Sequence, residues 1–432
     1  MIKILFLAII LLGLLLLSVS QIGHLSQYTD SMVKTGAIFI LIFSLIVISR
    51  YFILLLLSML NLFRHIKDKE KNRSDHSRMV TVIVPCFNEE VVIKASLESL
   101  KNQTYRNFEI LVVDDGSTDN TFLIAKNMEF SEKGRKLIAI TKENQGKAEA
   151  LNYGIEMAKG ELILSVDADS KLSPDAIELM VGYFDDPKVG AVAGSVYVTN
   201  QNTMWTKLQA LEYIQGLNLV RNGQAFLKLV NIIPGPIGMF KKSAVKEAGG
   251  YQSDTYAEDC DLTLHLISKG YKIDYEIDAI SYTEAPEDLM DLLKQRYRWT
   301  RGILQSILKH KSSLWKLHKN FAMSMVIWYM LFEAVFWPIA SILANFFIIY
   351  IGVTSGQSVM LVYWWIIFTV LDVAASLYCV SVTKESMKLV LYSLYYRIFF
   401  INVVNIAKVL ATIEEFFGVK MNWGKLDRKG RI

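Results

Sequence analysis

Long apolar runs stand at both ends of this chain, and a stretch with mixed polar and apolar positions lies between them. Residues 1–20 and 35–62 are almost wholly apolar, and each run is long enough to cross a bilayer as a helix. Residues 321–353 and 359–382 carry one acidic residue each and are also expected to span. The pattern therefore predicts membrane helices at both ends and a polar domain between them.

Two apolar segments allow more than one interpretation. A basic start and an apolar core also fit a cleaved secretory signal for residues 1–20, but a second apolar run follows and no clear small-x-small cleavage site does. Residues 388–412 include basic residues and asparagines. If this segment crossed fully, the basic tail would lie outside, against the positive-inside rule, so we expect it to be interfacial or re-entrant.

The middle of the chain has the pattern of a βαβ sheet. Between about residues 78 and 285, short apolar runs alternate with amphipathic stretches. Apolar residues recur at helical intervals over 89–101 and 146–159. The strands predicted from the apolar runs are 81–85, 108–113, 137–141, 162–166 and 190–198. We therefore predict an α/β, Rossmann-like domain, in which ligands bind where strands end and helices begin.

A basic amphipathic stretch follows this domain. Between about residues 287 and 318, leucines and isoleucines are spaced among lysines and arginines, which is typical of a helix lying on a membrane surface. The chain thus divides into two N-terminal transmembrane helices (1–63), the α/β domain (64–286), interfacial helices (287–319), and a C-terminal transmembrane region with a basic tail (320–432).

The distribution of charge and the cysteine content indicate the compartment of the α/β domain and the kinds of site to expect. Six Lys or Arg residues lie between positions 64 and 78, directly after the second apolar run, whereas 21–34 has one lysine. The positive-inside rule places the α/β domain in the cytoplasm, and anionic lipid or topology explains the basic run better than nucleic acid does. The three cysteines and six histidines are scattered, so neither a disulfide framework nor a zinc site is predicted.

Paired carboxylates end two of the predicted strands. In LVVDDGS, Asp114 and Asp115 precede a glycine that permits close backbone approach, and a carboxylate can accept the imide hydrogen of uracil. In SVDADS, Asp167 and Asp169 would face the same side of an extended segment and could hold one Mg²⁺ or Mn²⁺. The alternatives are a capped turn and a solvated acidic turn.

The motif PCFNEE forms the first strand-end loop. Phe87 could stack on a base, and Glu89 could accept a hydrogen bond from a ribose hydroxyl. The alternative is an ordinary turn in which Asn88 caps the next helix.

The motif YAEDCD supplies a candidate general base. Sugar transfer needs a carboxylate that takes the proton from the acceptor hydroxyl. Asp259 is preferred for this role, with Glu258 and Asp261 as alternatives at the same helix start. Acidic residues also favour a first helical turn without any catalytic role.

The motif QRYRW lies in the amphipathic stretch. Helical spacing sets Gln295 beside Arg298 and Trp299. An arginine there can pair with a diphosphate, and an indole can pack against a sugar ring. The alternative is a basic and aromatic belt at the membrane surface.

In this order, the FNE loop, DDG, DAD, the ED pair and QxxRW resemble the membrane-embedded, processive family 2 glycosyltransferases. The resemblance covers nearly the whole chain and is nearest to the bacterial poly-β-1,6-N-acetylglucosamine synthases, with chitin, hyaluronan and cellulose synthases more distant. It implies a GT-A fold. The usual TED reads Ala257, Glu258, Asp259 here, which puts a supporting hydrogen bond in doubt but not the base.

The resemblance also implies residue roles. Glu89 and Asp115 would contact the uridine, and Asp259 would be the base. Lys147, in NQGKAEALN, matches a position near the donor, and IPGPIGMFKKSA resembles the loop that lines the acceptor. The remaining roles fall on residues already named: Asp167 and Asp169 for diphosphate and metal, and Gln295, Arg298 and Trp299 for diphosphate and acceptor.

The implied reaction is inverting, processive transfer of a sugar, N-acetylglucosamine by resemblance, from a UDP-sugar to a growing β-linked polysaccharide that leaves across the plasma (inner) membrane. The expected partners are the UDP-sugar, the nascent polysaccharide, membrane lipids and a small accessory membrane subunit, and no nucleic acid. The alternatives are a transferase that adds one sugar to a lipid and a non-enzymatic export scaffold.

Polar residues inside the apolar segments have two explanations. Glu333, Asp372, Arg397 and Asn402 would be costly if they faced lipid. They could line a path for the polymer, or they could pair with one another and hold the helices together.

Overall fold

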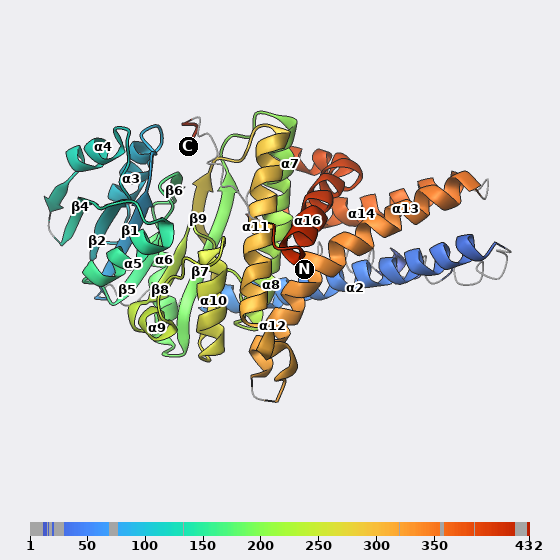
Figure 1. The fold of residues 1–432 in the computed structure, drawn as a ribbon, viewed down its shortest axis with the longest axis horizontal. Helices are drawn as coiled ribbons and strands as arrows, with labels where there is room; N and C mark the ends of the chain where they lie inside the picture. Colours follow the sequence, from blue (N-terminus) through green and yellow to red (C-terminus); the bar gives the residue numbers. More distant parts are fainter. Residues whose placement is uncertain are drawn as a thin grey trace.

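The computed structural model describes residues 12–14, 16, 20, 30–68, 77–132, 134–318, 320–354, 358–383, 385–419 and 430–432. An α/β domain lies at one end of the molecule, and long apolar helices project from it (Figure 1). The predicted helix over residues 1–20 falls almost wholly outside the described part of the chain.

The strands of the described residues form one mixed sheet in the order β3-β4-β2-β1-β5-β8-β7-β9-β6. β1 pairs in parallel with β2 and β5, and β2 with β4, whereas β8 is antiparallel to both of its neighbours. The strands are β1 (Val80–Cys86), β2 (Phe108–Asp114), β3 (Phe130–Glu132), β4 (Arg135–Thr141), β5 (Leu162–Ser165), β6 (Ser170–Leu172), β7 (Val189–Val198), β8 (Gly238–Lys241) and β9 (Lys272–Thr283).

Both faces of the sheet are covered, which is why its central strands are predominantly apolar. Alternate residues of a strand point to opposite faces. Accordingly, Val82 of β1 packs in one core with Leu97, whereas Ile83 packs in the other with Leu151 and Ile155. The five predicted strands are all confirmed, and the continuous burial of β1, β2 and β7 explains why they read as unbroken apolar runs.

Helices flank the sheet and follow it in the chain. Those of the α/β domain are α3 (Ile93–Lys101), α4 (Thr121–Asn127), α5 (Lys147–Met157), α6 (Ala176–Val181), α7 (Met204–Glu212), α8 (Leu219–Phe226), α9 (Lys242–Ala248) and α10 (Glu258–Ser268). The remaining helices are α2 (Ser31–Asp68), α11 (Leu289–Lys309), α12 (Phe321–Leu331), α13 (Trp337–Thr354), α14 (Ser358–Thr383), α15 (Ser393–Tyr395) and α16 (Ile401–Phe416). The amphipathic helix predicted after the α/β domain is therefore present as α11.

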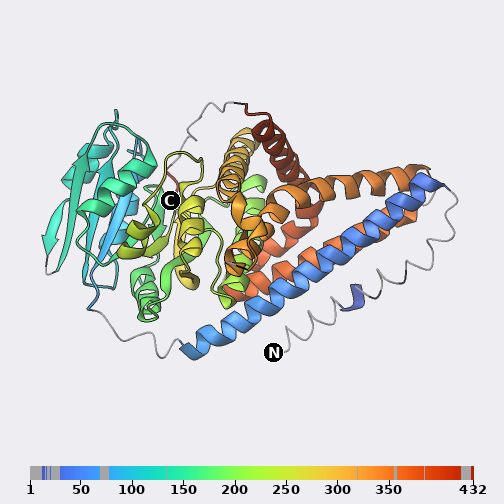
Figure 2. The ribbon, with the colours of Figure 1, turned by 60° about the horizontal axis from the view of Figure 1, so that its bottom comes forward.

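Four described segments are long and apolar enough to cross a membrane: Ser31–Lys67, Phe321–Thr354, Trp365–Thr383 and Met387–Phe416. Three of them, carried by α2, α13 and α14, extend side by side away from the α/β domain (Figure 2). This arrangement, with apolar helices before and after the α/β domain, is the one predicted from the sequence.

The fourth segment starts beside the α/β domain and ends beside α11. Before it, the carbonyl oxygen of Thr383 accepts a hydrogen bond of 3.0 Å from the Tyr197 hydroxyl. At its end, Arg301 of α11 forms a 2.6 Å ion pair with Glu415. Two ends on one side fit the re-entrant course expected from the charge of the tail.

Polar side chains of the apolar helices pair across helices. The pairs are Arg50 with Glu333 at 2.6 Å, Arg397 with Asp372 at 2.7 Å, and Asn345 with Asn402 at 2.8 Å. An ion paired in this way avoids the cost of an unpaired charge in a low-dielectric setting. Of the two explanations above, the geometry favours the one in which these residues hold the helices together.

Candidate active site

Two strand-end loops interlock at the carboxyl ends of β1 and β2, where Cys86 is paired with Asp114. Backbone N–H groups of the first loop donate to side chains of the second: Asn88 to Ser117 Oγ at 2.8 Å, and Glu89 to Thr121 Oγ1 at 2.7 Å. Asn88 Oδ1 accepts from Thr118 N, also at 2.8 Å. Asn88 therefore joins the two loops instead of capping the next helix.

The exposed fraction of Phe87 is 38%, so part of its side chain lies at the surface of these loops. Glu89 lies in the same loop and is half-buried. Their roles toward a nucleotide stay predictions.

Asp115 is buried and fully engaged with the protein. Its carboxylate accepts from Lys142 Nζ at 2.7 Å, from Gly146 N at 2.7 Å and from Gln145 N at 3.1 Å. It therefore anchors the loop that leads into Lys147, the first residue of α5. The predicted contact of Asp115 with uracil stays a prediction, since its oxygens bond to this loop.

Lys147 joins two of the predicted acidic motifs. Its ammonium lies 2.7 Å from Asp167 Oδ1 and 3.0 Å from Glu258 Oε1. Removal from water acts to lower the pKa of Lys147, but the charges of Asp167 and Glu258 outweigh this and hold the pKa well above its ordinary value. Lys147 is thus a permanent positive charge between the carboxylates.

Gly235 brings a further loop into the same cluster. A Cβ on this residue would lie 2.8 Å from Asp167 Oδ2 and 2.9 Å from Lys147 Nζ, so a larger residue would push the charged groups apart. Its backbone N–H donates to Asp259 Oδ2 at 3.2 Å. The loop that resembles an acceptor-lining segment therefore contacts the proposed base directly.

Asp259 lies in the first turn of α10, beside Glu258. Its Oδ1 accepts from Cys260 N at 2.7 Å. Burial, and then the negative charge of Glu258, raise the pKa of Asp259 to about 6, although Lys147 opposes them. A cavity of about 10 Å³ lined by Asp259, Glu258 and Lys147 has room for about one water molecule.

The DAD segment differs locally from its prediction. β5 ends at Ser165, and the N–H of Ser170 donates to the carbonyl oxygen of Asp167 at 3.1 Å, so Asp167 and Asp169 sit in a turn and not in an extended segment. The assumption that alternation alone aligns the two side chains is therefore wrong. Their carboxylate oxygens still suit a hard cation such as Mg²⁺ or Mn²⁺, and the metal role stays a prediction.

The QRYRW residues lie on α11, as expected. Gln295 is buried and accepts a hydrogen bond from Arg296. The indole of Trp299 packs 4.3 Å from the Arg296 guanidinium and is tilted against Tyr213. Arg296, which sequence reasoning passed over, is buried and paired with Glu212. Its i+4 neighbour Thr300 is also buried, and this helical spacing of buried positions was the available signal.

The α11 helix is pressed against the loop that precedes Asp259. A Cβ on Gly302 would lie 2.6 Å from Ala257, so only glycine allows this approach. Gln305 Oε1 accepts from Tyr256 N at 3.0 Å. These contacts, which sequence reasoning also missed, connect the QRYRW helix to the ED pair.

The structure thus gathers Lys147, Asp167, Glu258 and Asp259 at one point on the sheet. Residues 81–249 match the sequence profile described as glycosyl transferase family 2. The chain carries a family 2 glycosyltransferase domain. The matched range contains Lys147 and Asp167 and ends before the ED pair and QRYRW.

Relatives of this glycosyltransferase chain are polysaccharide synthases. It is 34% identical over 240 residues to a poly-beta-1,6-N-acetyl-D-glucosamine synthase of Staphylococcus aureus (strain COL), covering 54% of this chain and 57% of that protein. It is 32% identical over 278 residues to the Staphylococcus epidermidis protein of that description, covering 62% and 66%. The similarity thus spans less than two thirds of the length of these relatives.

The fold of the glycosyltransferase domain also has a solved counterpart. A mannosyltransferase from Pyrobaculum calidifontis, solved with GDP-Man and Mn²⁺, superposes with a TM-score of 0.57 at 20% identity, covering 86% of this chain and 99% of that one. At that identity the likeness concerns the fold alone. It confirms the predicted GT-A architecture of the glycosyltransferase domain.

We predict that Gly302→Ala destabilises the glycosyltransferase, because the added methyl group collides with Ala257. Overpacking should lower the free energy of unfolding by about 1–3 kcal/mol, as measured by thermal unfolding of detergent-purified protein. Gly216→Ala is the matched control, since its nearest contact is 3.7 Å away. Equal stability of the two variants would contradict the tight packing of α11.

Proposed function

We propose that this protein is an inverting, processive glycosyltransferase that extends a β-linked polysaccharide from a UDP-sugar, with N-acetylglucosamine as the sugar. The observation that carries the proposal is the cluster of Lys147, Asp167, Glu258 and Asp259 within a family 2 domain. The sugar and the donor are taken from the named activity of the relatives, poly-beta-1,6-N-acetyl-D-glucosamine synthesis.

Asp259 is the proposed base. With a pKa of about 6 it is ionised at neutral pH and basic enough to accept a proton in the transition state. As the acceptor hydroxyl oxygen bonds to the anomeric carbon, its proton passes to Asp259 and the bond from that carbon to the diphosphate breaks. Attack opposite the leaving group inverts the anomeric centre in one step.

Lys147 is the proposed partner of the departing diphosphate. A positive charge fixed by Asp167 and Glu258 needs no reorganisation when negative charge develops on the leaving oxygen. Asp167 and Asp169 are the residues proposed to hold Mg²⁺ or Mn²⁺. Such an ion, when bound, would neutralise the diphosphate further.

The remaining predicted residues are assigned around this centre. Phe87, Glu89 and Asp115 lie on or behind the interlocked loops and are proposed to bind the uridine. Gln295, Arg298 and Trp299 are proposed to bind the diphosphate and the acceptor end. The assignment of Gln295, Arg298 and Trp299 is supported by the contact of α11 with the loop before Asp259.

The glycosyltransferase domain is proposed to lie in the cytosol, with α2, α13 and α14 in the plasma or inner membrane. The basic residues after α2 support this orientation, and a nucleotide sugar is made on that side. The polymer is proposed to leave between the membrane helices. Because Glu333, Asp372 and Asn402 are paired with other helices, we do not assign them to its path.

We expect Asp259→Asn to abolish sugar transfer while UDP still binds, because the amide keeps the shape of the side chain and loses the base. Purified protein in detergent would be incubated with a panel of UDP-sugars, and released UDP and UDP affinity measured. UDP-N-acetylglucosamine should be the donor that the natural protein turns over. Normal turnover by Asp259→Asn would refute the base assignment.

The rate of transfer should rise with pH through about 6 and then level, because Asp259 must be ionised to accept the proton. Glu258→Gln removes the neighbouring negative charge and lowers the pKa of Asp259. It should therefore move the rising part of the pH–rate profile to lower pH. Glu156→Gln, exposed on α5, is the control and should leave the profile in place. If Glu258→Gln left the rising part of the pH–rate profile in place, this would argue against coupling of Glu258 and Asp259.

Removal of divalent cations should stop the transfer, and Mg²⁺ or Mn²⁺ should restore it. Asp169→Asn should raise the Mn²⁺ concentration needed for half-maximal rate by at least about tenfold, because it removes an anionic ligand. Full activity in excess chelator would rule out the role given to Asp167 and Asp169.

A further inference from the structure

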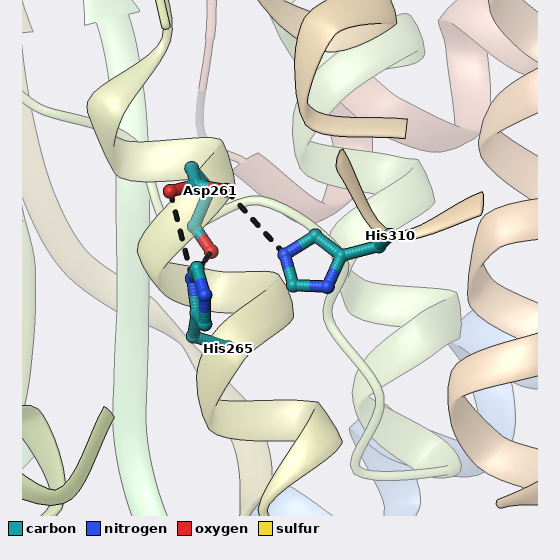
Figure 3. A group of neighbouring side chains, drawn as sticks. All are labelled: Asp261, His265 and His310. Carbon is teal, nitrogen blue, oxygen red and sulfur yellow. Dashed lines mark hydrogen bonds and ion pairs between the residues drawn. The ribbon is translucent and has the colours of Figure 1, made fainter. Parts of the chain in front are cut away.

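A second cluster of ligand-type side chains lies farther along α10. Asp261 and His265 are four residues apart and so share a face of that helix. His310, which ends α11, points toward them (Figure 3). The ligand atoms of the three residues all lie within 4.8 Å of one another. The spacing of histidines along the chain did not reveal the cluster, because His310 comes from a different helix.

The distances from the two imidazoles to the Asp261 carboxylate are long for hydrogen bonds, whereas His265 Nδ1 lies 3.1 Å from the backbone carbonyl oxygen of Asp261. Asp261 Oδ1 lies 3.4 Å from His310 Nε2, and Asp261 Oδ2 lies 3.5 Å from His265 Nδ1. A strong hydrogen bond would bring such atoms to about 2.7–3.2 Å. In a tetrahedral metal site with bonds of about 2.0–2.2 Å, neighbouring ligand atoms are about 3.3–3.5 Å apart. The two measured distances, which end on different oxygens of the Asp261 carboxylate, fall in that range.

The buried carboxylate has an unused oxygen. The exposed fraction of Asp261 is 0%, and within the described residues neither its Oδ1 nor His310 Nε2 makes a hydrogen bond. A buried polar atom left without a partner is costly. These two atoms face each other, so one cation between them would satisfy both.

Lys309 is the competing cation. Its ammonium donates to Asp261 Oδ2 at 2.9 Å and to Asp254 Oδ1 at 2.8 Å. It therefore occupies one oxygen of Asp261 and leaves Oδ1 for another ligand. Asp254 shares the charge of Lys309 and reduces its repulsion of a nearby metal ion.

We propose that Asp261, His265 and His310 bind a divalent transition-metal ion of the zinc class, with water completing the coordination. Two imidazoles and one carboxylate are a ligand set that zinc favours, in contrast to the oxygen ligands of Asp167 and Asp169. The ion connects α10, which begins with Glu258 and Asp259, to the end of α11. It therefore fixes the helix that carries the proposed base relative to the QRYRW helix.

The test uses the full-length protein in detergent, stripped of metal and titrated with Co²⁺. We expect one equivalent to give the intense visible absorption bands of a tetrahedral site, which octahedral Co²⁺ on carboxylates does not give. His265→Ala and His310→Ala should each weaken this binding by more than about tenfold. His318→Ala, exposed and outside the cluster, should bind as the natural protein does.

Lys309→Met supplies a second test that does not remove a ligand. Loss of the positive charge beside Asp261 should tighten Co²⁺ binding. If the alanine variants fail to fold by circular dichroism, this variant decides alone. His65 lies with Glu276 and Asp278 in another group of ligand-type side chains. Absence of the tetrahedral bands, bands retained in His310→Ala, bands lost instead in His65→Ala, or no tightening in Lys309→Met would each overturn the proposal.

Discussion

The ion pairs of Lys147 are the interaction on which the site depends. Asp167 follows β5, whereas Glu258 and Asp259 begin α10, and their like charges would repel one another without a cation among them. Lys147 supplies that cation, and its place is set by Asp115, which anchors the loop before α5. Asp115 of the DDG motif therefore supports the site by holding the loop before α5, independently of any contact with a nucleotide.

The same centre is connected to the membrane helices through α11. Gly302 and Gln305 hold this helix against the loop before Asp259, and Arg301 pairs with Glu415 at the end of the fourth apolar segment. On the N-terminal side of the domain, Arg64 near the end of α2 forms a 3.0 Å ion pair with Asp274 of β9. The glycosyltransferase domain is thus tied at both ends to the apolar helices.

The sequence predicted the architecture well where burial is uniform. The strands β1, β2 and β7 are predominantly apolar and fully buried, with Glu109 as the one acid inside their apolar runs, so their pattern favours strands. β9 was missed because it carries Asp274 and Glu276, acidic residues that are buried only because distant residues pair with them. The periodicity of apolar positions along the chain cannot by itself reveal such partners.

The site was predicted as an ordered set of residues, but not in its contacts. The ion pairs of Lys147, the close approach of Gly235 and the turn at Asp167 all arise from loops that meet only in the folded chain. The cluster of Asp261 with two histidines was missed for the same reason.

The central claim is that the bond between the donor sugar and its diphosphate breaks beside Lys147. A structure of the protein with UDP and Mn²⁺, in which the ion is located by its anomalous scattering, tests this most directly. The account predicts Mn²⁺ bonded to carboxylate oxygens of Asp167 and Asp169, with the diphosphate against Lys147 and the space in front of Asp259 open to an acceptor. A diphosphate and ion bound beyond about 6 Å from these charges, outside the reach of their mutual effect, would contradict it.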